Sequence, residues 1–268
     1  MVTGDALRHN ALMAVDPHAA PLSVAGRPEL TGGRRVGVLL SHGFTGSPFS
    51  MKPWGEFLAE RGYAVEVPRL PGHGTTWQEM NRTGWADWYA EISRTYAQLA
   101  QDNDVVVAAG LSMGGALVLR LAADQPDKLA GLVVVNPAIR TTRKDVLALP
   151  VLKHLVPAFP AIANDIKKPG MDEYAYPKTP LKAAASMMAG WKSVRADLGR
   201  IAVPVLYFRS TVDHVVDEST EPLITAGVSG PVTMRRLEDS YHVATIDNDA
   251  PVIFEESAEF IARVTAGS

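Results

Sequence analysis

Mostly apolar runs that alternate with longer amphipathic stretches constrain the fold of this chain more than any other feature. Such runs occupy residues 35–44, 104–110, 129–137 and 203–210, and a less apolar strand pattern follows at 231–238. Val and Leu runs without polar alternation are typical of parallel strands that are covered on both faces. Helical periodicity marks residues 87–100, 113–125 and 251–264. This order predicts an α/β fold, with a mostly parallel central sheet and helices on both faces.

The strand pattern is interrupted between residues 138 and 198. This segment is helical in pattern, punctuated by proline and rich in Leu, Ile, Ala and Met, without a convincing strand. We therefore expect one core, formed by residues 31–137 and 199–268, with residues 138–198 inserted over the sheet as an apolar cap. A length of 268 residues is consistent with one such domain. Residues 1–30 form an N-terminal arm that we expect to be frayed.

Composition argues against several classes of function. The net formal charge is −3, with both signs mixed along the chain, which argues against a nucleic-acid partner or attraction to an anionic bilayer. Cysteine is absent, which rules out disulfides, thiolate catalysis and Cys-ligated metals. The N-terminal residues contain no apolar core of signal-peptide length, and no stretch approaches the roughly 18 apolar residues of a membrane span. We therefore expect a soluble, cytoplasmic protein.

The stretch AAGLSMGGAL, residues 108–117, places Ser112 between an apolar run and a helical pattern. A sharp strand-to-helix turn needs small neighbours because the adjoining backbone segments approach closely, and Gly110 and Gly114 hold those positions. The turn directs the Ser112 side chain to the carboxyl edge of the sheet, beside a helix N-terminus that stabilises developing negative charge. Ser112 is therefore a candidate nucleophile, although glycines that serve packing alone would give the same short motif.

A serine hydroxyl is a weak nucleophile unless a base accepts its proton and a third group orients that base. After the strand at 203–210 the sequence offers Asp213 and Asp217. Asp213 lies closer to the strand end and is the preferred acid, whereas Asp217 is expected to cap the following helix. His242 follows the next strand and is the preferred base. The chain order Ser, Asp, His is the one expected of an α/β-hydrolase.

Six other histidines compete for the role of base: His9, His18, His42, His73, His154 and His214. The first two lie in the N-terminal arm, and His154 lies in the cap. His214 directly follows the acid and is expected to point elsewhere, whereas His42 and His73 are expected to brace their own glycine-containing loops. Neither helical HxxxH spacing nor paired carboxylates accompany these histidines, so we predict no metal and no other cofactor.

Acyl transfer also needs two N–H donors aimed at the oxyanion of its tetrahedral intermediate. The backbone N–H of Met113 directly follows the nucleophile and is one candidate. Phe44, in the glycine-rich loop HGFTG after the first apolar run, is the other. A simple glycine-rich turn would have the same sequence. The occurrence of the HGFTG loop together with the Ser, Asp and His candidates favours an oxyanion hole.

Five motifs occur together along the chain: GVLLSHGFTGSP, GYAVEVPRLPGHGTT, GLSMGG, DHVVD and SYHVATID. In combination they resemble bacterial monoacylglycerol lipases and the related small carboxylesterases of the α/β-hydrolase superfamily. The resemblance extends from the strand at 35–44 to the C-terminal helix and includes the cap stretch NDIKKPGMDEYAYPKTP, but it does not explain the N-terminal arm. It implies the α/β-hydrolase fold with an inserted helical cap.

The resemblance carries roles to five positions of this chain. Ser112, Asp213 and His242 take the roles of nucleophile, acid and base, and the N–H groups of Phe44 and Met113 form the oxyanion hole. The implied reaction is hydrolysis of a monoacylglycerol ester to glycerol and a fatty acid through an acyl-enzyme intermediate, without a cofactor.

The resemblance also bears on the substrate. In monoacylglycerol lipases the cap encloses an apolar acyl tunnel and carries a glutamate that helps to bind the glycerol head. Glu173 and Ile162 occupy the positions that match this glutamate and an aliphatic tunnel residue. A solvated helix charge is the alternative for Glu173. The apolar cap residues also suggest transient docking on a lipid surface, and packing toward the core explains them equally well.

Two alternative functions remain open. A broader short-chain carboxylesterase or an acyl-thioesterase would use the same three residues, whereas Ser112 argues against dehalogenases and epoxide hydrolases, which use an Asp nucleophile. A ligand-binding α/β-hydrolase relative that has lost catalysis would be expected to have a damaged triad or oxyanion loop, and here every element is intact. The sequence leaves the oligomeric state open.

Overall fold

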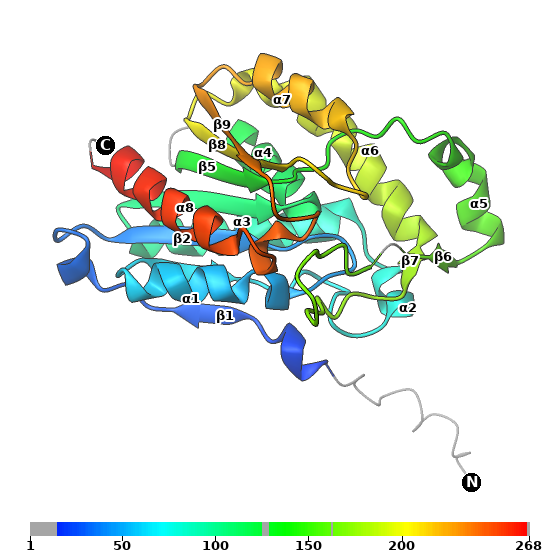
Figure 1. Ribbon diagram of the computed structural model, residues 1–268, viewed down its shortest axis with the longest axis horizontal. Helices are drawn as coiled ribbons and strands as arrows, with labels where there is room; N and C mark the ends of the chain where they lie inside the picture. The colour runs from blue at the N-terminus through cyan, green and yellow to red at the C-terminus, as the bar shows by residue number, and fades with distance from the viewer. Residues whose placement is uncertain (1–14, 125–128, 162, 267–268) are drawn as a thin grey trace, which may run out of the picture.

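The computed structural model describes residues 15–124, 129–161 and 163–266 (Figure 1). Within these residues a seven-stranded sheet runs in the order β1-β3-β2-β4-β5-β8-β9. Its strands are β1 (Leu22–Val24), β2 (Val36–Ser41), β3 (Ala64–Val67), β4 (Val105–Leu111), β5 (Leu129–Val135), β8 (Val205–Ser210) and β9 (Val232–Leu237). Every neighbouring pair is parallel except β1 and β3. The predicted mostly parallel sheet is confirmed.

Helices cover both faces of the sheet, as predicted (Figure 1). One face packs against α1 (Lys52–Glu60) and α8 (Ala250–Thr265). The other packs against α3 (Trp85–Asp102) and α4 (Met113–Asp124), with α6 (Leu181–Asp197) lying on both of them. Shorter helices are α2 (Trp77–Met80), α5 (Leu149–Leu155) and α7 (Glu221–Gly227). No helix in these described ranges is both long and apolar enough to cross a membrane.

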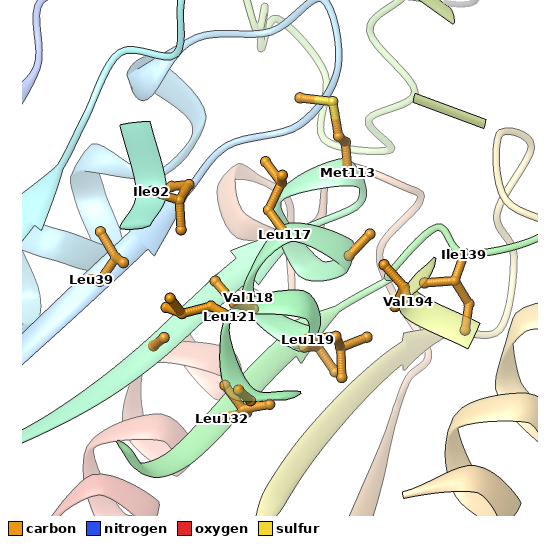
Figure 2. Packing of buried hydrophobic residues seen from close by; sticks show 14 of the residues in the cluster. Leu39, Ile92, Met113, Leu117, Val118, Leu119, Leu121, Leu132, Ile139 and Val194 are labelled. Atoms are coloured by element: carbon orange, nitrogen blue, oxygen red, sulfur yellow. The ribbon is translucent and has the colours of Figure 1, made fainter. Parts of the chain in front are cut away.

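Helix α4 is buried on nearly every side. Its residues from Met113 to Leu119 are all buried, because these first two turns carry no polar side chain. Figure 2 shows its side chains between Leu39 and Ile92 on one side and Ile139 and Val194 on the other. A helix enclosed in this way is held firmly, so the residue at its N-terminus has a fixed position relative to the sheet.

The segment between β5 and β8, residues 138–198, carries α5, the short strands β6 (Ala158–Pro160) and β7 (Lys178–Pro180), and α6. Strands β6 and β7 pair antiparallel with each other, apart from the main sheet. The sequence predicts no strand here, and that expectation is wrong, because three-residue strands containing proline have too little periodicity to recognise. Helix α6 contributes buried side chains to the main core, so this end of the segment is firmly attached.

The N-terminal arm is ordered where the structure describes it, from residue 15 onward. Strand β1 extends the sheet by pairing with β3. The His18 ring stacks on Tyr174 with a centroid distance of 4.0 Å, and the Asp16 carboxylate accepts from the His18 N–H at 2.9 Å. The expectation of fraying is therefore wrong for this part, because contacts with distant residues hold it. His9 lies outside the described residues.

Candidate active site

Ser112 occupies the turn between β4 and α4. Its φ of 55° is in the left-handed region, which a residue other than glycine adopts at an energetic cost, and its N–H donates to the Val135 carbonyl at 3.0 Å. A Cβ at Gly110 would stand 2.3 Å from the Gly114 backbone, and a Cβ at Gly114 would stand 2.1 Å from the Ser41 carbonyl oxygen. The close backbone approach predicted from the two glycines is confirmed.

Asp213 and His242 come together at the same edge of the sheet. Asp213 follows β8, His242 follows β9, and His242 Nδ1 lies 3.0 Å from Asp213 Oδ2. The N–H groups of Val215 and Val216 donate to Asp213 Oδ1 at 2.9 and 2.8 Å. The Asp213 side chain is fully buried, and that of His242 is 8% exposed. The carboxylate is thus held with one oxygen directed at the imidazole.

Opposing influences set the protonation of this pair. Burial raises the pKa of the Asp213 carboxyl, but the charge and hydrogen bond of His242, together with the Val216 N–H and the charge of Arg209, outweigh it and lower the pKa to about 2. Burial lowers the pKa of His242, but Asp213, with smaller contributions from Glu173 and Asp165, raises it above its ordinary value. Asp213 is therefore ionised at neutral pH. A carboxylate acceptor at Nδ1 keeps the proton on that nitrogen and leaves Nε2 able to accept one.

The backbone N–H groups of Phe44 and Met113 lie beside this serine. Met113 begins α4, so its N–H is one of the first four in the helix, which have no acceptor within it. The loop before Phe44 passes close to the serine, since a Cβ added at Gly43 would stand 3.5 Å from Ser112 Cβ. Neither N–H has an acceptor among the residues that the structure describes. Both N–H groups are therefore available as donors.

Ser112 and His242 line a cavity of about 420 Å³. Phe44 and Glu173, two further candidates from the sequence, also line it. Its apolar lining residues include Val146, Leu149, Leu152, Leu181, Met187, Met188, Trp191, Val215 and Val216. A cavity with apolar walls and a few convergent polar groups suits a ligand that combines a hydrocarbon chain with a polar reacting centre.

Glu173 is half-buried and is held by a reciprocal pair of hydrogen bonds with Asn164. The Asn164 N–H donates to Glu173 Oε1, and the Glu173 N–H donates to Asn164 Oδ1, both at 2.9 Å. Burial raises the pKa of Glu173, against the opposing hydrogen bond from Asn164. Glu173 lines the cavity as well as holding this turn, so a solvated surface charge is a poor description. Ile162, the other substrate-binding candidate, lies outside the described residues.

His42 and His73 brace their loops, as predicted. His42 Nε2 accepts from the Leu70 N–H at 3.2 Å, and its Nδ1 lies 2.9 Å from the Gly43 carbonyl oxygen. The His73 ring packs edge-on against that of His42, with a centroid distance of 4.9 Å. Burial lowers the pKa of His42 to about 4 and that of His73 well below its ordinary value. Both rings are therefore neutral structural groups.

Asp165, in the segment between β6 and β7, is a site residue that the sequence reasoning missed. Its Oδ2 accepts from the backbone N–H groups of His242 and His214 at 3.2 and 3.1 Å, and its Oδ1 lies 2.7 Å from His214 Nδ1. One carboxylate thus ties together the loops that carry Asp213 and His242. Nothing in the spacing of the chain signals this contact. His214 points away from the acid, as predicted.

Asp217 accepts from the Ser219 N–H at 2.9 Å and caps the turn that leads into α7, which confirms its predicted role. Hydrogen bonds from Ser219 and Thr142 outweigh its burial and lower the pKa of Asp217. Across the described ranges, no three His, Asp or Glu side chains gather as a metal site would require.

Fold and site together place the chain among the serine hydrolases with the α/β-hydrolase fold. Residues 33–249 match the Hydrolase_4 family, described as serine aminopeptidase, S33, and the chain belongs to this family.

Relatives of known name cover most of the chain. It is 41% identical over 233 residues to a thermostable monoacylglycerol lipase from Bacillus sp. (strain H-257). The aligned region covers 85% of this chain and 91% of that lipase. It is 27% identical over 231 residues to a carboxylesterase from Bacillus subtilis (strain 168), and that alignment covers 85% of this chain and 92% of the carboxylesterase. A solved structure from work on the metagenome-derived lipolytic enzymes LipS and LipT has a TM-score of 0.88 and 40% identity, covering 93% of this chain and all of that one.

Proposed function

We propose that this protein hydrolyses the ester bond of monoacylglycerols and releases glycerol and a fatty acid. The observation that carries the proposal is the cavity of about 420 Å³, in which Ser112 and His242 meet mostly apolar walls. Two carboxylates, those of Asp165 and the half-buried Glu173, also line it. The similarity to a monoacylglycerol lipase at 41% identity supports the same substrate class.

In the proposed reaction, Ser112 Oγ attacks the ester carbonyl carbon while His242 Nε2 accepts the Ser112 hydroxyl proton. Asp213 stabilises the resulting imidazolium through the 3.0 Å contact at Nδ1. The N–H groups of Phe44 and Met113 stabilise the oxyanion. His242 then donates the proton to the departing glycerol oxygen, and the acyl group stays on Ser112. Water, deprotonated by His242, then attacks the acyl carbonyl carbon. The bond to Ser112 Oγ breaks as His242 returns the proton to that oxygen, and the fatty acid leaves.

Glu173 supports recognition of the glycerol head. A carboxylate accepts hydrogen bonds from neighbouring hydroxyl groups, and Asn164 already fixes one of its oxygens. Glu173→Gln keeps the size of the side chain but replaces one hydrogen-bond-accepting oxygen with a donating NH2 group. KM for monoacylglycerol should therefore rise, while KM for a p-nitrophenyl ester, which lacks glycerol, stays unchanged. An equal rise for both substrates would contradict the assignment.

Residues 138–198 act in this proposal as a cap that contacts lipid surfaces. Leu147 and Leu155 are 79% and 73% exposed, and Val151 between them is 65% exposed, so three large apolar side chains at four-residue spacing face outward. Leu149 and Leu152 of the same stretch face the cavity. Surface apolar groups next to the cavity would bring it against lipid that contains the substrate.

Ser112→Ala is the direct test of the mechanism. The variant should keep the melting temperature of the wild type and lose both ester hydrolysis and labelling by a fluorophosphonate probe. Turnover retained by this variant, or a wild type that the probe does not label, would overturn the assignment and favour a ligand-binding protein.

A substrate panel tests the specificity. Monoacylglycerols should give the highest kcat/KM when compared with di- and triacylglycerols, a short p-nitrophenyl ester and an acyl-CoA. A preference for the short ester would instead identify a general carboxylesterase, and a preference for acyl-CoA would identify a thioesterase.

A further inference from the structure

Arg209, the penultimate residue of β8, places a buried guanidinium on the proposed catalytic acid. Its side chain is 5% exposed, and its Nη1 donates to Asp213 Oδ2 at 2.6 Å. Its Nη2 donates to the Val216 carbonyl at 2.7 Å. Asp213 Oδ2 is also the oxygen that faces His242 Nδ1. Arg209 and His242 therefore share one carboxylate oxygen.

The proposed mechanism assigns no role to this arginine, although burying a charged guanidinium is energetically costly. A guanidinium stays charged at any pH at which proteins are folded, and a buried charge is tolerated only when it is paired. The pairing fixes the carboxylate plane, because Oδ1 is held by two backbone N–H groups and Oδ2 by Arg209. The orientation of Asp213 toward His242 thus survives loss of the His242 contact.

We infer that Arg209 is a positioning residue for the proposed reaction: it holds the Asp213 carboxylate toward His242 and offsets part of the negative charge that His242 meets. The inference rests on the proposed roles of Asp213 and His242. Arg209 is not among the residues that line the substrate cavity, so it acts through Asp213 and not on the substrate.

The charges around His242 explain why such an offset matters. Three carboxylates, those of Asp213, Asp165 and Glu173, favour the imidazolium form. An imidazolium cannot accept the serine proton, so a base surrounded only by negative charge would work only at elevated pH. Arg209 places its positive charge directly on the first of these carboxylates. The ring of His214 contacts the second, Asp165, through Nδ1 at 2.7 Å, and this contact is the same in the wild type and in an Arg209 variant. Arg209 therefore extends the activity of His242 as a base toward lower pH.

The pH dependence of two variants tests the inference. Arg209→Gln removes the charge and keeps a hydrogen-bond donor, whereas Arg209→Lys keeps the charge. With a p-nitrophenyl ester, the acidic limb of kcat/KM should move up by about one pH unit in R209Q, which is about a tenfold loss of kcat/KM well below the limb. In R209K the acidic limb should stay within a few tenths of a pH unit of its wild-type position. KM should change little in both variants.

A purely structural role for Arg209 would lower kcat in both variants without moving the limb, and that result would overturn the inference. If R209Q fails to fold, the double variant R209Q/D213N decides, because removing both members of a buried ion pair leaves no unpaired charge. The inference expects the double variant to fold where R209Q does not. A double variant that also fails to fold would show that Arg209 serves the core alone.

Titration of the His242 ring by NMR separates this inference from the proposed function. The ring pKa should be higher in R209Q than in the wild type whether or not the protein hydrolyses a given ester. Absence of Ser112-dependent turnover in the wild type would overturn the proposed function and leave the titration result standing. An unchanged ring pKa in a folded R209Q protein would overturn the inference and leave the proposed function standing.

Discussion

Gly114→Ala tests how closely the turn at Ser112 depends on backbone contact. The added Cβ would stand 2.1 Å from the Ser41 carbonyl oxygen and 2.7 Å from that of His42, whereas ordinary contacts begin at 3.4 Å. Both obstacles are backbone atoms, so no side chain can rotate away, and the start of α4 must move from β2 by about an ångström. Overpacking of this kind costs about 3 kcal/mol, which lowers the Tm by roughly 6–12 °C.

The same displacement moves Ser112 relative to Phe44 and His242. A misplacement of about 1 Å in reacting groups costs on the order of 100-fold in rate, so kcat should fall by that factor. Calorimetry and ester hydrolysis measure the two effects. Gly199→Ala is the matched control, because the nearest atom to its added Cβ is 3.8 Å away. A G114A protein with the melting temperature and kcat of the wild type would refute the argument from close approach.

Two further predictions concern the cap surface and the behaviour in acid. Leu147→Ser combined with Val151→Ser should weaken co-sedimentation with monoacylglycerol-containing vesicles several-fold and leave turnover of a soluble ester intact, because both side chains are exposed; undiminished co-sedimentation would count against cap docking. Burial keeps the pKa of His42 at about 4, so between pH 6.5 and 4 the unfolded chain binds a proton that the folded protein does not. The His42 contribution to the free energy of unfolding should therefore fall by up to about 3 kcal/mol as the pH falls through that range, and buried His73 adds to the fall. Urea titration measures the sum, and His42→Gln should reduce the slope by the His42 share.

The architecture could be predicted from the sequence because it depends on features of short segments, namely apolar runs and glycine positions. A run of Val and Leu forms a buried strand wherever helices cover both faces, and such runs gave the parallel strands β2, β4, β5 and β8. Glycines at positions 110 and 114 identify the turn, since backbone clearance is required there whatever packs around it. Asp213 and His242 were found because loops after parallel strands meet at one edge of a sheet.

Contacts between distant segments were beyond such reasoning. Strand β1 has only three residues, and its pairing depends on the exposed edge of β3. His18 is held by Tyr174, a residue 156 positions later in the chain, through ring stacking that no periodicity records. Asp165 accepts from the backbone N–H of His242, a residue 77 positions later in the chain.

By itself the sequence determined the order of strands and helices, the turn at Ser112 and the pairing of Asp213 with His242. Only the tertiary structure decided the electrostatic surroundings of that pair. A buried charge takes its partner from whatever group the completed fold brings within hydrogen-bonding distance, and Arg209 and Asp165 became neighbours of the site in that way. The strength of their effect on His242 depends on burial and distance, which sequence spacing does not encode.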